Sequence, residues 1–456
     1  METLEADVIV ISAGTAGLAA AVAAAEKGME VIAFEKGSTT GGTANMGMGP
    51  FAVESRLQKL KNVPLTREEA FNIFMEATHW SVDARLVSNY INKSADTIAW
   101  LEEMGVEFID CIAYIKGAHF THHVVKPASG VPGPRCASYM MKALTERAEE
   151  LGVQIFLQTP VKKIIKEEGR ITGVIAEGPT GEIRANAKAV IIATGGFGDN
   201  PEWIKKYTGF EWGRDLYSTR VPGLVGDGIK MAWEVGAGRE RMQMELICNI
   251  PVSIDDQGNI TPDMIITNVF KHPNLMVNIQ GERFINEEIM GNPSYLANAV
   301  ARQKDRCAFV IVDAQIVKHY EKRGFEWLTV LSPEEKVDNL YEKLEQECEN
   351  SEHMFVADSL EELAEQTGID LDGLKKTLDE YNEACETGRD KVFYKSPRYL
   401  RPIRKPKFFA GKYYPSAYGS LGGIKVNHRL EVLTEDYEII PGLYAAGVDA
   451  NAIYGD

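Results

Sequence analysis

The chain has 456 residues, of which 45% are hydrophobic and 25% charged, enough to bury large cores, so we expect two domains. A net charge of −17 argues against nucleic acid or an anionic membrane as a partner. Neither a signal peptide nor a long apolar run is found, so no membrane insertion is expected. The six cysteines show no CxxC pair or metal-ligand spacing, which predicts reduced thiols in a cytoplasmic protein, with export of a processed precursor as the alternative.

The first predicted elements are a strand, a tight turn, a helix and a second strand within residues 8–35. Gly14 and Gly17 lie where the backbone of a dinucleotide-binding unit approaches a pyrophosphate and where the helix packs closely against the strand. Glu35 ends the second strand, in the place of a carboxylate that accepts hydrogen bonds from an adenosine ribose. Ser12 stands where the fingerprint has its first glycine, which adds a Cβ to the turn. This context predicts a dinucleotide site in place of an ordinary βαβ unit.

Helices and strands then alternate along the chain. Apolar residues at helical spacing predict helices within 66–105, and Thr66 opens this segment with a capping-box pattern. A polar loop is expected at 110–135, followed by a helix at 137–151. Further predicted elements are strands at 154–157, 161–166, 171–177 and 189–192, and acidic helices at 333–349 and 359–388.

A second glycine-rich run, residues 36–49, directly follows Glu35. A nicotinamide enzyme has no need of this run, whereas in this position it resembles the flavin-contacting loop of the fumarate reductase and succinate dehydrogenase flavoprotein superfamily. Further segments resemble motifs of that family in its order along almost the whole chain, at 193–197, 226–228, 277–287 and 441–447. The resemblance implies that the dinucleotide is FAD.

The resemblance also implies an α/β fold class, with a Rossmann-like FAD-binding domain and an inserted α+β capping domain. The first part of the FAD-binding domain is then expected at 1–238, the capping (substrate) domain at 239–395 and the second part of the FAD-binding domain at 396–456. The sequence ends at Asp456, where the family continues into a Gly-rich turn and a final helix. We therefore expect the last part to be truncated.

The dinucleotide motif and the resemblance together give a set of predicted cofactor-binding residues. This set is Ser12, Gly14, Thr15, Ala16, Gly17, Glu35, Lys36, Gly41, Gly42, Thr43, Val161, Thr194, Gly195, Gly196, Asp227, Gly422, Gly423, Gly447 and Asp449. No metal site is predicted. His119, His122 and His123 resemble a metal cluster, but no carboxylate or cysteine lies at ligand spacing, so we expect a polar loop near the substrate mouth. A catalytic role for one of these histidines stays open.

Three catalytic positions of the family are replaced in this chain. The arginine that donates a proton is expected within 288–293, where no arginine occurs. The histidine that grips a substrate carboxylate would stand at Gly419, and a second histidine is absent near 248–251. Because a dicarboxylate needs charge-assisted clamps, the sequence predicts that fumarate is not the substrate.

The loop at 418–423 indicates a different chemistry. Its sequence, Tyr-Gly-Ser-Leu-Gly-Gly, is similar to the Tyr-x-Ser-x-Gly-Gly loop of flavin-dependent 3-ketosteroid dehydrogenases in the same superfamily. The resemblance implies that a tyrosine hydroxyl and a backbone N–H polarise a ketone, which makes Tyr418 and Ser420 the candidate catalytic residues. The alternative is that both side chains only shape a turn over the flavin.

The predicted function is that of an FAD-dependent oxidoreductase, moving hydride between flavin N5 and a C=C or CH–CH bond activated by a carbonyl or similar group. An enoate or enone reductase and a ketosteroid-type dehydrogenase both fit this description. The alternative is a flavin-binding electron-transfer subunit of a larger assembly. The expected partners are a small-molecule substrate and a separate electron donor or acceptor, because the sequence has neither a second dinucleotide motif nor a Cys-x-x-Cys-His haem motif.

Overall fold

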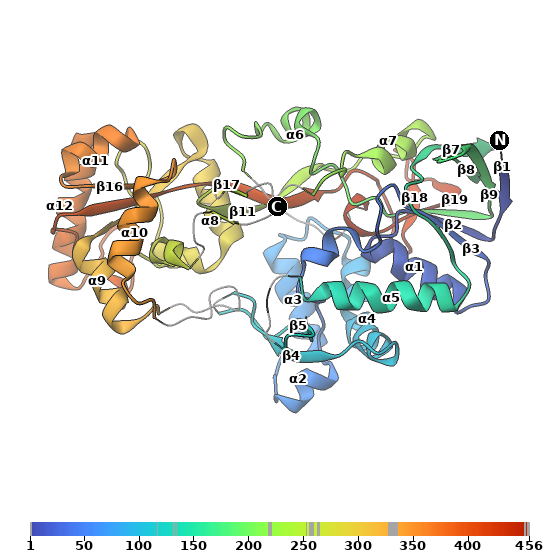
Figure 1. Ribbon diagram of the computed structural model, residues 1–456, viewed down its shortest axis with the longest axis horizontal. Coiled ribbons are helices and arrows are strands. Elements are labelled where there is room, and N and C mark those ends of the chain that lie inside the picture. Colours follow the sequence, from blue (N-terminus) through green and yellow to red (C-terminus); the bar gives the residue numbers. More distant parts are fainter. Residues whose placement is uncertain are drawn as a thin grey trace.

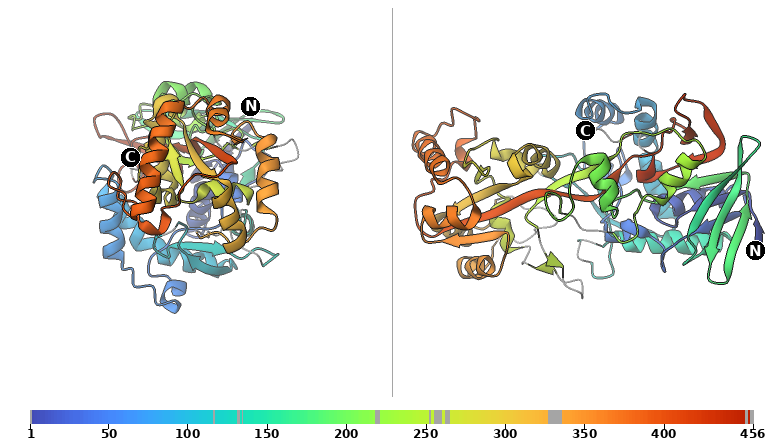
Figure 2. Two further views of the ribbon diagram at one scale, coloured as in Figure 1. Left: turned by 90° about the vertical axis from the view of Figure 1, so that its left-hand side faces the viewer. Right: turned by 90° about the horizontal axis from the view of Figure 1, so that it is seen from above.

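The computed structural model describes residues 2–115, 117–130, 133, 135–217, 221–251, 265–326, 336–450 and 453, and the backbone at 253–254 and 260–261. The molecule is elongated and has two lobes, which we call the first and the second lobe (Figures 1 and 2). The first lobe holds both ends of the described chain and the second holds most of its middle. The long strand β17 (Phe408–Leu421) runs from one lobe to the other.

The centre of the first lobe is a mostly parallel sheet with the strand order β18-β19-β10-β2-β3-β6. Its strands are β18 (Glu431–Leu433), β19 (Ile439–Ala445), β10 (Ala189–Ile192), β2 (Val8–Ile11), β3 (Val31–Phe34) and β6 (Gln154–Phe156). Only β18 in this sheet runs antiparallel to its neighbour. The carboxyl ends of β2, β3, β10 and β19 therefore lie at one edge, where α/β sheets bind dinucleotides. This arrangement confirms the predicted α/β class.

A smaller sheet and a set of helices complete the first lobe. The smaller sheet has the order β1-β9-β8-β7 and contains β1 (Glu2–Glu5), β9 (Gly181–Asn186), β8 (Arg170–Gly178) and β7 (Val161–Glu167). The helices are α1 (Thr15–Ala25), α2 (Arg56–Leu60), α3 (Arg67–Ala77), α4 (Ala84–Glu103), α5 (Ala137–Glu150), α6 (Pro201–Thr208) and α7 (Asp227–Glu234), with the 3₁₀ helices η1 (Gly42–Met46) and η6 (Gly447–Asp449). Helices α1 and α5 pack side by side through Leu18, Val22 and Met141 (Figure 1).

The segment expected to be a polar loop at 110–135 is partly a β-hairpin, so this prediction was wrong in part. Strand β4 (Phe108–Ile112) pairs antiparallel with β5 (His122–Val125). Cys111, Val124 and Val125 are buried, and this apolar face gives the hairpin a core to pack on.

The second lobe is built around an antiparallel sheet with the order β11-β17-β15-β14, in which β16 also pairs with β17. Its strands are β11 (Gln243–Asn249), β14 (Leu275–Val277), β15 (Ala308–Asp313) and β16 (Met354–Ala357), with β12 (Ser253–Ile254) and β13 (Ile260–Thr261) as a separate short pair. Its helices are α8 (Pro293–Ala301), α9 (Ala314–Arg323), α10 (Leu340–Glu349), α11 (Leu360–Thr367) and α12 (Leu371–Thr387), with the 3₁₀ helices η2 (Ile266–Lys271), η3 (Glu287–Gly291), η4 (Lys304–Arg306) and η5 (Pro397–Tyr399). The left-hand view of Figure 2 shows these helices around the sheet.

Two predicted acidic helices differ from the structure. The one expected at 359–388 is divided into α11 and α12 at Gly368, whose φ of +75° is a left-handed helix end that favours glycine. The one expected at 333–349 is α10, which begins at Leu340, and residues 333–335 lie outside the described chain. No helix in the described ranges is long and apolar enough to cross a membrane.

Strands β11 and β17 pair with each other where the lobes meet. Met244 of β11 and Ala417 of β17 belong to the core of the first lobe, whereas Cys248 and Tyr413 belong to the core of the second. The second core also contains Ile403. Judged by the core in which each residue packs, the chain returns to the first lobe within β17, further along than the boundary expected at 396. The three-part division into domains stays a prediction.

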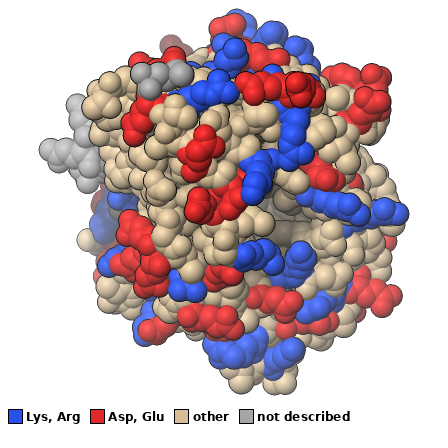
Figure 3. Space-filling model, turned by 90° about the vertical axis from the view of Figure 1, so that its right-hand side faces the viewer, with Lys and Arg blue, Asp and Glu red and all other residues tan. Residues whose placement is uncertain are grey.

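Figure 3 shows the face of the first lobe that contains the N-terminal strand region. Acidic and basic side chains are interspersed over this face, and its centre is hollowed. The face therefore carries no broad patch of a single sign.

Candidate functional site

The turn between β2 and α1 forms a cradle that only small residues allow. A Cβ on Gly17 would lie 2.0 Å from the carbonyl oxygen of Ser12, so helix α1 can approach the strand only with glycine there. Gly14 is the N-cap of α1, and no side chain caps this helix end. The first-turn N–H groups of a helix have no intrahelical acceptor, and they offer an anion site for a pyrophosphate.

The carboxylate of Glu35 lies against this turn from the end of β3. It accepts hydrogen bonds from Ser12 Oγ at 3.0 Å and from the backbone N–H of Ala13 at 2.8 Å. Its other oxygen accepts from Gly37 N at 2.7 Å. The serine that replaces the first glycine of the motif therefore positions the acidic residue, a role that the motif alone did not reveal.

The glycine-rich run after Glu35 closes over the same turn. Gly41 N donates to Ala13 O at 2.8 Å, and Gly41 has a φ of +97°. A Cβ on Gly42 would lie 3.4 Å from Gly14 Cα. Lys36 forms an ion pair of 2.6 Å with Asp227, the first residue of α7. The structure thus places the predicted residues of three separate segments around one turn.

Asp449 connects the end of β10 to η6. Its carboxylate accepts hydrogen bonds from Thr194 N, from Thr194 Oγ1 at 3.0 Å, from Gly195 N at 3.2 Å and from Gly196 N at 2.9 Å. Burial raises the pKa of Asp449, and these hydrogen bonds act in the opposite direction. The carboxylate therefore fixes the loop at 194–196 in place at the carboxyl edge of the sheet.

The glycines of the C-terminal part lie beside these loops. Gly422 N donates to Val448 O at 3.0 Å, which holds the end of β17 against η6. Gly423 has a φ of +132°, and a Cβ there would meet the side chain of Ile229. A Cβ on Gly447 would lie 3.1 Å from the Cβ of Ala16 in α1. The predicted loops are thus in contact with one another through backbone that tolerates no added side chain.

These loops fit an FAD. The cradle at Gly14 and Gly17 suits the pyrophosphate, and Glu35 has the acceptor oxygens that a ribose needs. Thr43 lies in η1 and Thr15 and Ala16 lie in the first turn of α1. Val161 begins β7 with its side chain buried, so only its backbone is available to a ligand.

Tyr418 lies on β17 where the strand pairing is irregular. Met244 pairs with Ser420 and Leu246 with Ala417, so two residues of β17, Tyr418 and Gly419, face the single residue Glu245. This is a β-bulge, which re-aims side chains. In a regular strand, Tyr418 and Ser420 would share one face because they are two residues apart. Here Tyr418 is 43% exposed, whereas Ser420 is fully buried.

The hydroxyl of Ser420 is directed into the first lobe. Its Oγ accepts a hydrogen bond from Phe197 N at 2.7 Å, and a Cβ on Gly196 would lie 2.3 Å from this oxygen. Ser420 therefore joins β17 to the loop at 194–197 and positions Tyr418 and the following glycines. Its predicted catalytic role remains untested, and its contacts favour a positioning role.

The side chains of Tyr114 and Glu245 lie close to Tyr418, and the sequence analysis singled out neither. Tyr114 lies next to the end of β4 and forms a side-chain hydrogen bond with Tyr418. Burial raises the pKa of both phenols, and the nearby Glu245 raises them further. Both tyrosines therefore stay protonated near neutral pH and can donate hydrogen bonds. Tyr114 and Glu245 could not be found from the sequence, because neither a bulge nor a cross-strand neighbour has a short sequence signature.

The three histidines considered as metal ligands separate in the structure. His123 is buried, and its Nε2 accepts from Ser55 Oγ at 2.6 Å while its Nδ1–H donates to Thr121 O at 3.2 Å. His122 stacks at a tilt on Tyr114, with ring centroids 5.1 Å apart, and His119 is exposed. Across the described residues, no group of three or more His, Cys, Asp or Glu side chains could hold a metal ion.

The Arg-Phe-x-Asn-Glu motif at 283–287 forms a buried charge network in the second lobe. Arg283 makes two hydrogen bonds of 2.9 Å to Glu287 and one of 2.9 Å to Asp390. Lys395 adds a contact of 3.3 Å to Glu287. Burial acts to raise the pKa of Asp390, but the hydrogen bond from Arg283 outweighs it and helps to lower this pKa to about 2. The charges of this motif are therefore paired with one another inside the second lobe.

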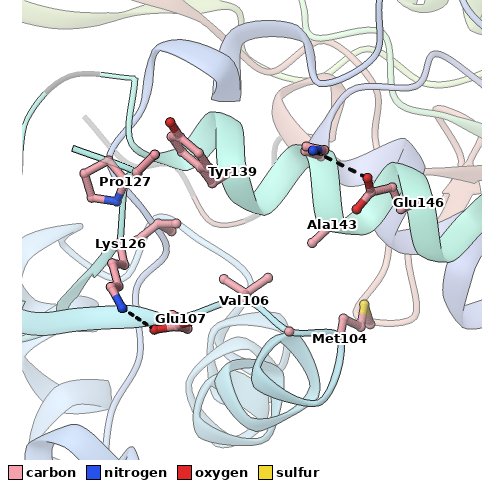
Figure 4. Close-up of a pocket in the computed structure, with 12 residues that line it drawn as sticks. Met104, Val106, Glu107, Lys126, Pro127, Tyr139, Ala143 and Glu146 are labelled. Carbon is pink, nitrogen blue, oxygen red and sulfur yellow. Dashed lines mark hydrogen bonds and ion pairs between the residues drawn. The ribbon is translucent and has the colours of Figure 1, made fainter. Parts of the chain in front are cut away.

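A surface pocket of about 340 Å³ lies between α4, β5 and α5 (Figure 4). Tyr139, Val106 and Pro127 contribute to its apolar lining, and an ion pair of 2.6 Å between Lys126 and Glu107 lies at one edge. Its lining contains none of the predicted site residues, so it is separate from the FAD loops.

Comparison with known proteins agrees with this geometry. The sequence matches the FAD binding domain family over residues 7–456. It is 31% identical to the vinyl phenol reductase of Lactiplantibacillus plantarum, over 99% of this chain and 91% of that protein. It is 26% identical to the cytochrome-type fumarate reductase of Shewanella frigidimarina, over 98% of this chain and 72% of that protein. The fold is similar to that of 3-ketosteroid Δ4-(5α)-dehydrogenase from Rhodococcus jostii, with a TM-score of 0.75 and 22% identity over 99% of this chain and 92% of that one.

The sheet edge, the glycine cradle and the acidic residue together define a dinucleotide-binding flavoprotein. The chain belongs to the FAD binding domain family. Its cofactor is FAD, and it is an FAD-dependent oxidoreductase related to the fumarate reductase flavoproteins, as the sequence predicted. The likeness to ketosteroid dehydrogenases holds for the fold.

Proposed function

We propose that this oxidoreductase reduces the C=C bond of an uncharged alkene that is conjugated with an aryl or carbonyl group. Its reaction class is hydride transfer between FAD and a C=C or CH–CH bond, which is the class of the relatives named above. The observation that carries the proposal is Tyr418: an exposed, protonated phenol on the strand that leads directly into Gly422 and Gly423 beside the FAD loops.

FAD supplies the hydride-transfer chemistry when it is bound. The protein's part is to hold the substrate and to stabilise charge that develops on it. The hydroxyl of Tyr418 can donate a hydrogen bond to a carbonyl or phenol oxygen conjugated with the reacting bond. Tyr114 orients that hydroxyl through their hydrogen bond. The Gly422–Gly423 backbone lets the reacting carbon approach the cofactor closely, because it has no side chain.

We choose an uncharged substrate because this chain lacks the arginine and the histidine that fumarate reductases have at their catalytic positions. The segment at 288–293, which begins in η3 and ends at the start of α8, contains no arginine, and Gly419 stands in place of the carboxylate-gripping histidine. A vinyl phenol, the substrate class in the name of the L. plantarum relative, is an uncharged alkene of this kind. A separate electron donor is part of the proposal, since the chain has a single dinucleotide motif.

The test is anaerobic reoxidation of the dithionite-reduced holoprotein, followed by flavin absorbance. We expect 4-vinylphenol or an enone to reoxidise the flavin in single turnover, and fumarate to do so at least about 100-fold more slowly, since a missing charged contact is worth about 3 kcal/mol. Reoxidation by fumarate at a rate comparable to that of the best alkene would overturn the proposal.

A further inference from the structure

Glu245 stands out among the charged side chains near Tyr418. It is exposed, and no ion pair or hydrogen bond of its carboxylate is found with any other residue of the described chain. Its neighbours along β11 are less exposed: Met244 is buried in the core of the first lobe, and Leu246 is partly buried against both cores. Glu245 is therefore a carboxylate without a protein partner in the described chain at the junction of the two lobes, and its charge is free to act on a ligand.

The bulge fixes where this carboxylate lies. Glu245 is the single residue opposite Tyr418 and Gly419, so it is the cross-strand neighbour of the phenol. Tyr418 in turn shares a side-chain hydrogen bond with Tyr114, so the three side chains lie close together. In agreement with this, the charge of Glu245 raises the pKa of both tyrosines. This surface, made of Glu245, Tyr418 and Tyr114, is called the phenol face below.

The phenol face is open to solvent. Glu245 and Tyr418 are both exposed, so a ligand can reach both side chains. Helix α8 packs against both β11 and β17, which holds the two strands in place.

From this geometry we infer that Glu245 determines substrate specificity: its carboxylate excludes substrates that carry a carboxylate next to the reacting bond and leaves the site to uncharged alkenes. The inference deepens the proposed function and rests on it. A substrate carbonyl that accepts the hydrogen bond of Tyr418 lies beside Glu245, the cross-strand neighbour of Tyr418, and a carboxylate in the same place is repelled by the charge of Glu245. Gly419 stands where the family has its carboxylate-gripping histidine, and Glu245 adds a repelling charge nearby.

The experiment compares two matched ligand pairs with the holoprotein at pH 8. The reactive pair is 4-phenylbut-3-en-2-one and cinnamate, in which a methyl ketone and a carboxylate occupy the same place next to the alkene, and flavin reoxidation gives kcat/KM. The unreactive pair is 4-phenylbutan-2-one and 3-phenylpropanoate, whose Kd values follow from the perturbation of the flavin absorbance. The variants are Glu245→Gln, which keeps size and removes charge, and Glu438→Gln as the control. Glu438 is an exposed carboxylate in the turn before β19 that makes no side-chain contact in the described chain.

We expect Glu245→Gln to improve kcat/KM and Kd for the carboxylate ligand of each pair by about tenfold or more relative to its uncharged partner, the effect of removing one charge at close range. FAD content and Tm should match the parent, and Glu438→Gln should leave both ratios within twofold. Unchanged ratios in Glu245→Gln would overturn the inference. If no alkene reoxidises the flavin, the proposed function fails, and the Kd ratio of the unreactive pair still decides the role of Glu245.

Discussion

Two residues of one short loop, Tyr418 and Ser420, have opposite surroundings. Tyr418 is exposed beside Tyr114 and Glu245, whereas the hydroxyl of Ser420 is fully buried on Phe197 N. A family motif that contains both residues does not distinguish these roles. The bulge distinguishes the two roles, because it changes the face of the strand on which each side chain lies.

We predict that Tyr418→Phe keeps the fold and the FAD and slows the chemical step by about 10²–10³, the usual loss when one donor to a developing oxyanion is removed. Single-turnover reoxidation of the reduced flavin by the substrate measures this step. A rate within twofold of the parent would make Tyr418 structural.

Ser420→Ala should behave in the opposite way. It leaves the buried N–H of Phe197 without an acceptor, which costs about 1–3 kcal/mol. We therefore expect a lower Tm and weaker FAD retention, with a single-turnover rate in the FAD-loaded fraction close to that of the parent. Normal stability with a rate reduced as in Tyr418→Phe would instead assign Ser420 to catalysis.

Glu35→Lys tests the ribose assignment. The substitution removes the acceptor of the Ser12, Ala13 and Gly37 hydrogen bonds and places a cation where FAD has no matching phosphate. We expect FAD affinity to fall by at least about 100-fold, measured by fluorescence titration of the apoprotein. Glu438→Lys, with the same charge change in an exposed turn, should retain the parental affinity. An unchanged Kd in Glu35→Lys would refute the assignment.

The elements that carry a strong periodic or capping signal were predictable from the sequence. The helix at 137–151 is found as α5, the strand at 189–192 is found as β10, and the capping box at Thr66 begins α3. The hairpin of β4 and β5 was missed because His119 to His123 read as a polar run, while its pairing partner lies ten residues earlier. Cross-strand pairing, bulges and the lobe crossing in β17 depend on contacts distant in sequence, which periodicity does not encode.

The hairpin strand β5 should make the protein acid-sensitive. Burial lowers the pKa of His122 to about 4, with His123 adding to the effect, and burial also lowers the pKa of His123. An unfolded histidine protonates near pH 6.5. The folded state therefore binds fewer protons in this window, so the stability contributed by the neutral rings is present above pH 6.5 and is lost as the pH falls towards 4.

We expect the Tm of the holoprotein to fall between pH 6.5 and 4, and to fall less steeply in His122→Gln. His119→Gln is the matched control, because His119 is exposed in the same segment. Thermal melts over a pH series measure the effect. Equal slopes in the parent and in His122→Gln would show that the buried ring does not contribute.

At the scale of the whole molecule, the second lobe depends on its buried charge network. Arg283→Met leaves Glu287 with Lys395 as its ion-pair partner and removes the ion pair of Asp390, which keeps only backbone N–H donors; breaking such a buried pair typically costs about 3–5 kcal/mol. Arg302→Met, on an exposed residue just after α8, should cost little.

The network variant also tests whether the lobes unfold together. Five of the six tryptophans lie in the first lobe, namely Trp80, Trp100, Trp203, Trp212 and Trp233. The sixth, Trp327, lies outside the described residues, so the measurement uses a Trp327→Phe background. Because β17 contributes to both cores, we expect Arg283→Met to lower the Tm reported by tryptophan fluorescence as much as that reported by circular dichroism. Two separate transitions would mean that the lobes unfold independently.

The paired strands β11 and β17 form a two-stranded connection between the lobes. Any change in the angle between the lobes must twist this ribbon, and its hydrogen-bonded ladder is interrupted at one place, opposite Glu245. Strain from such a twist concentrates where the ladder is broken. Tyr418 lies at that point, so we expect its phenol to move relative to a bound molecule whenever the angle between the lobes changes.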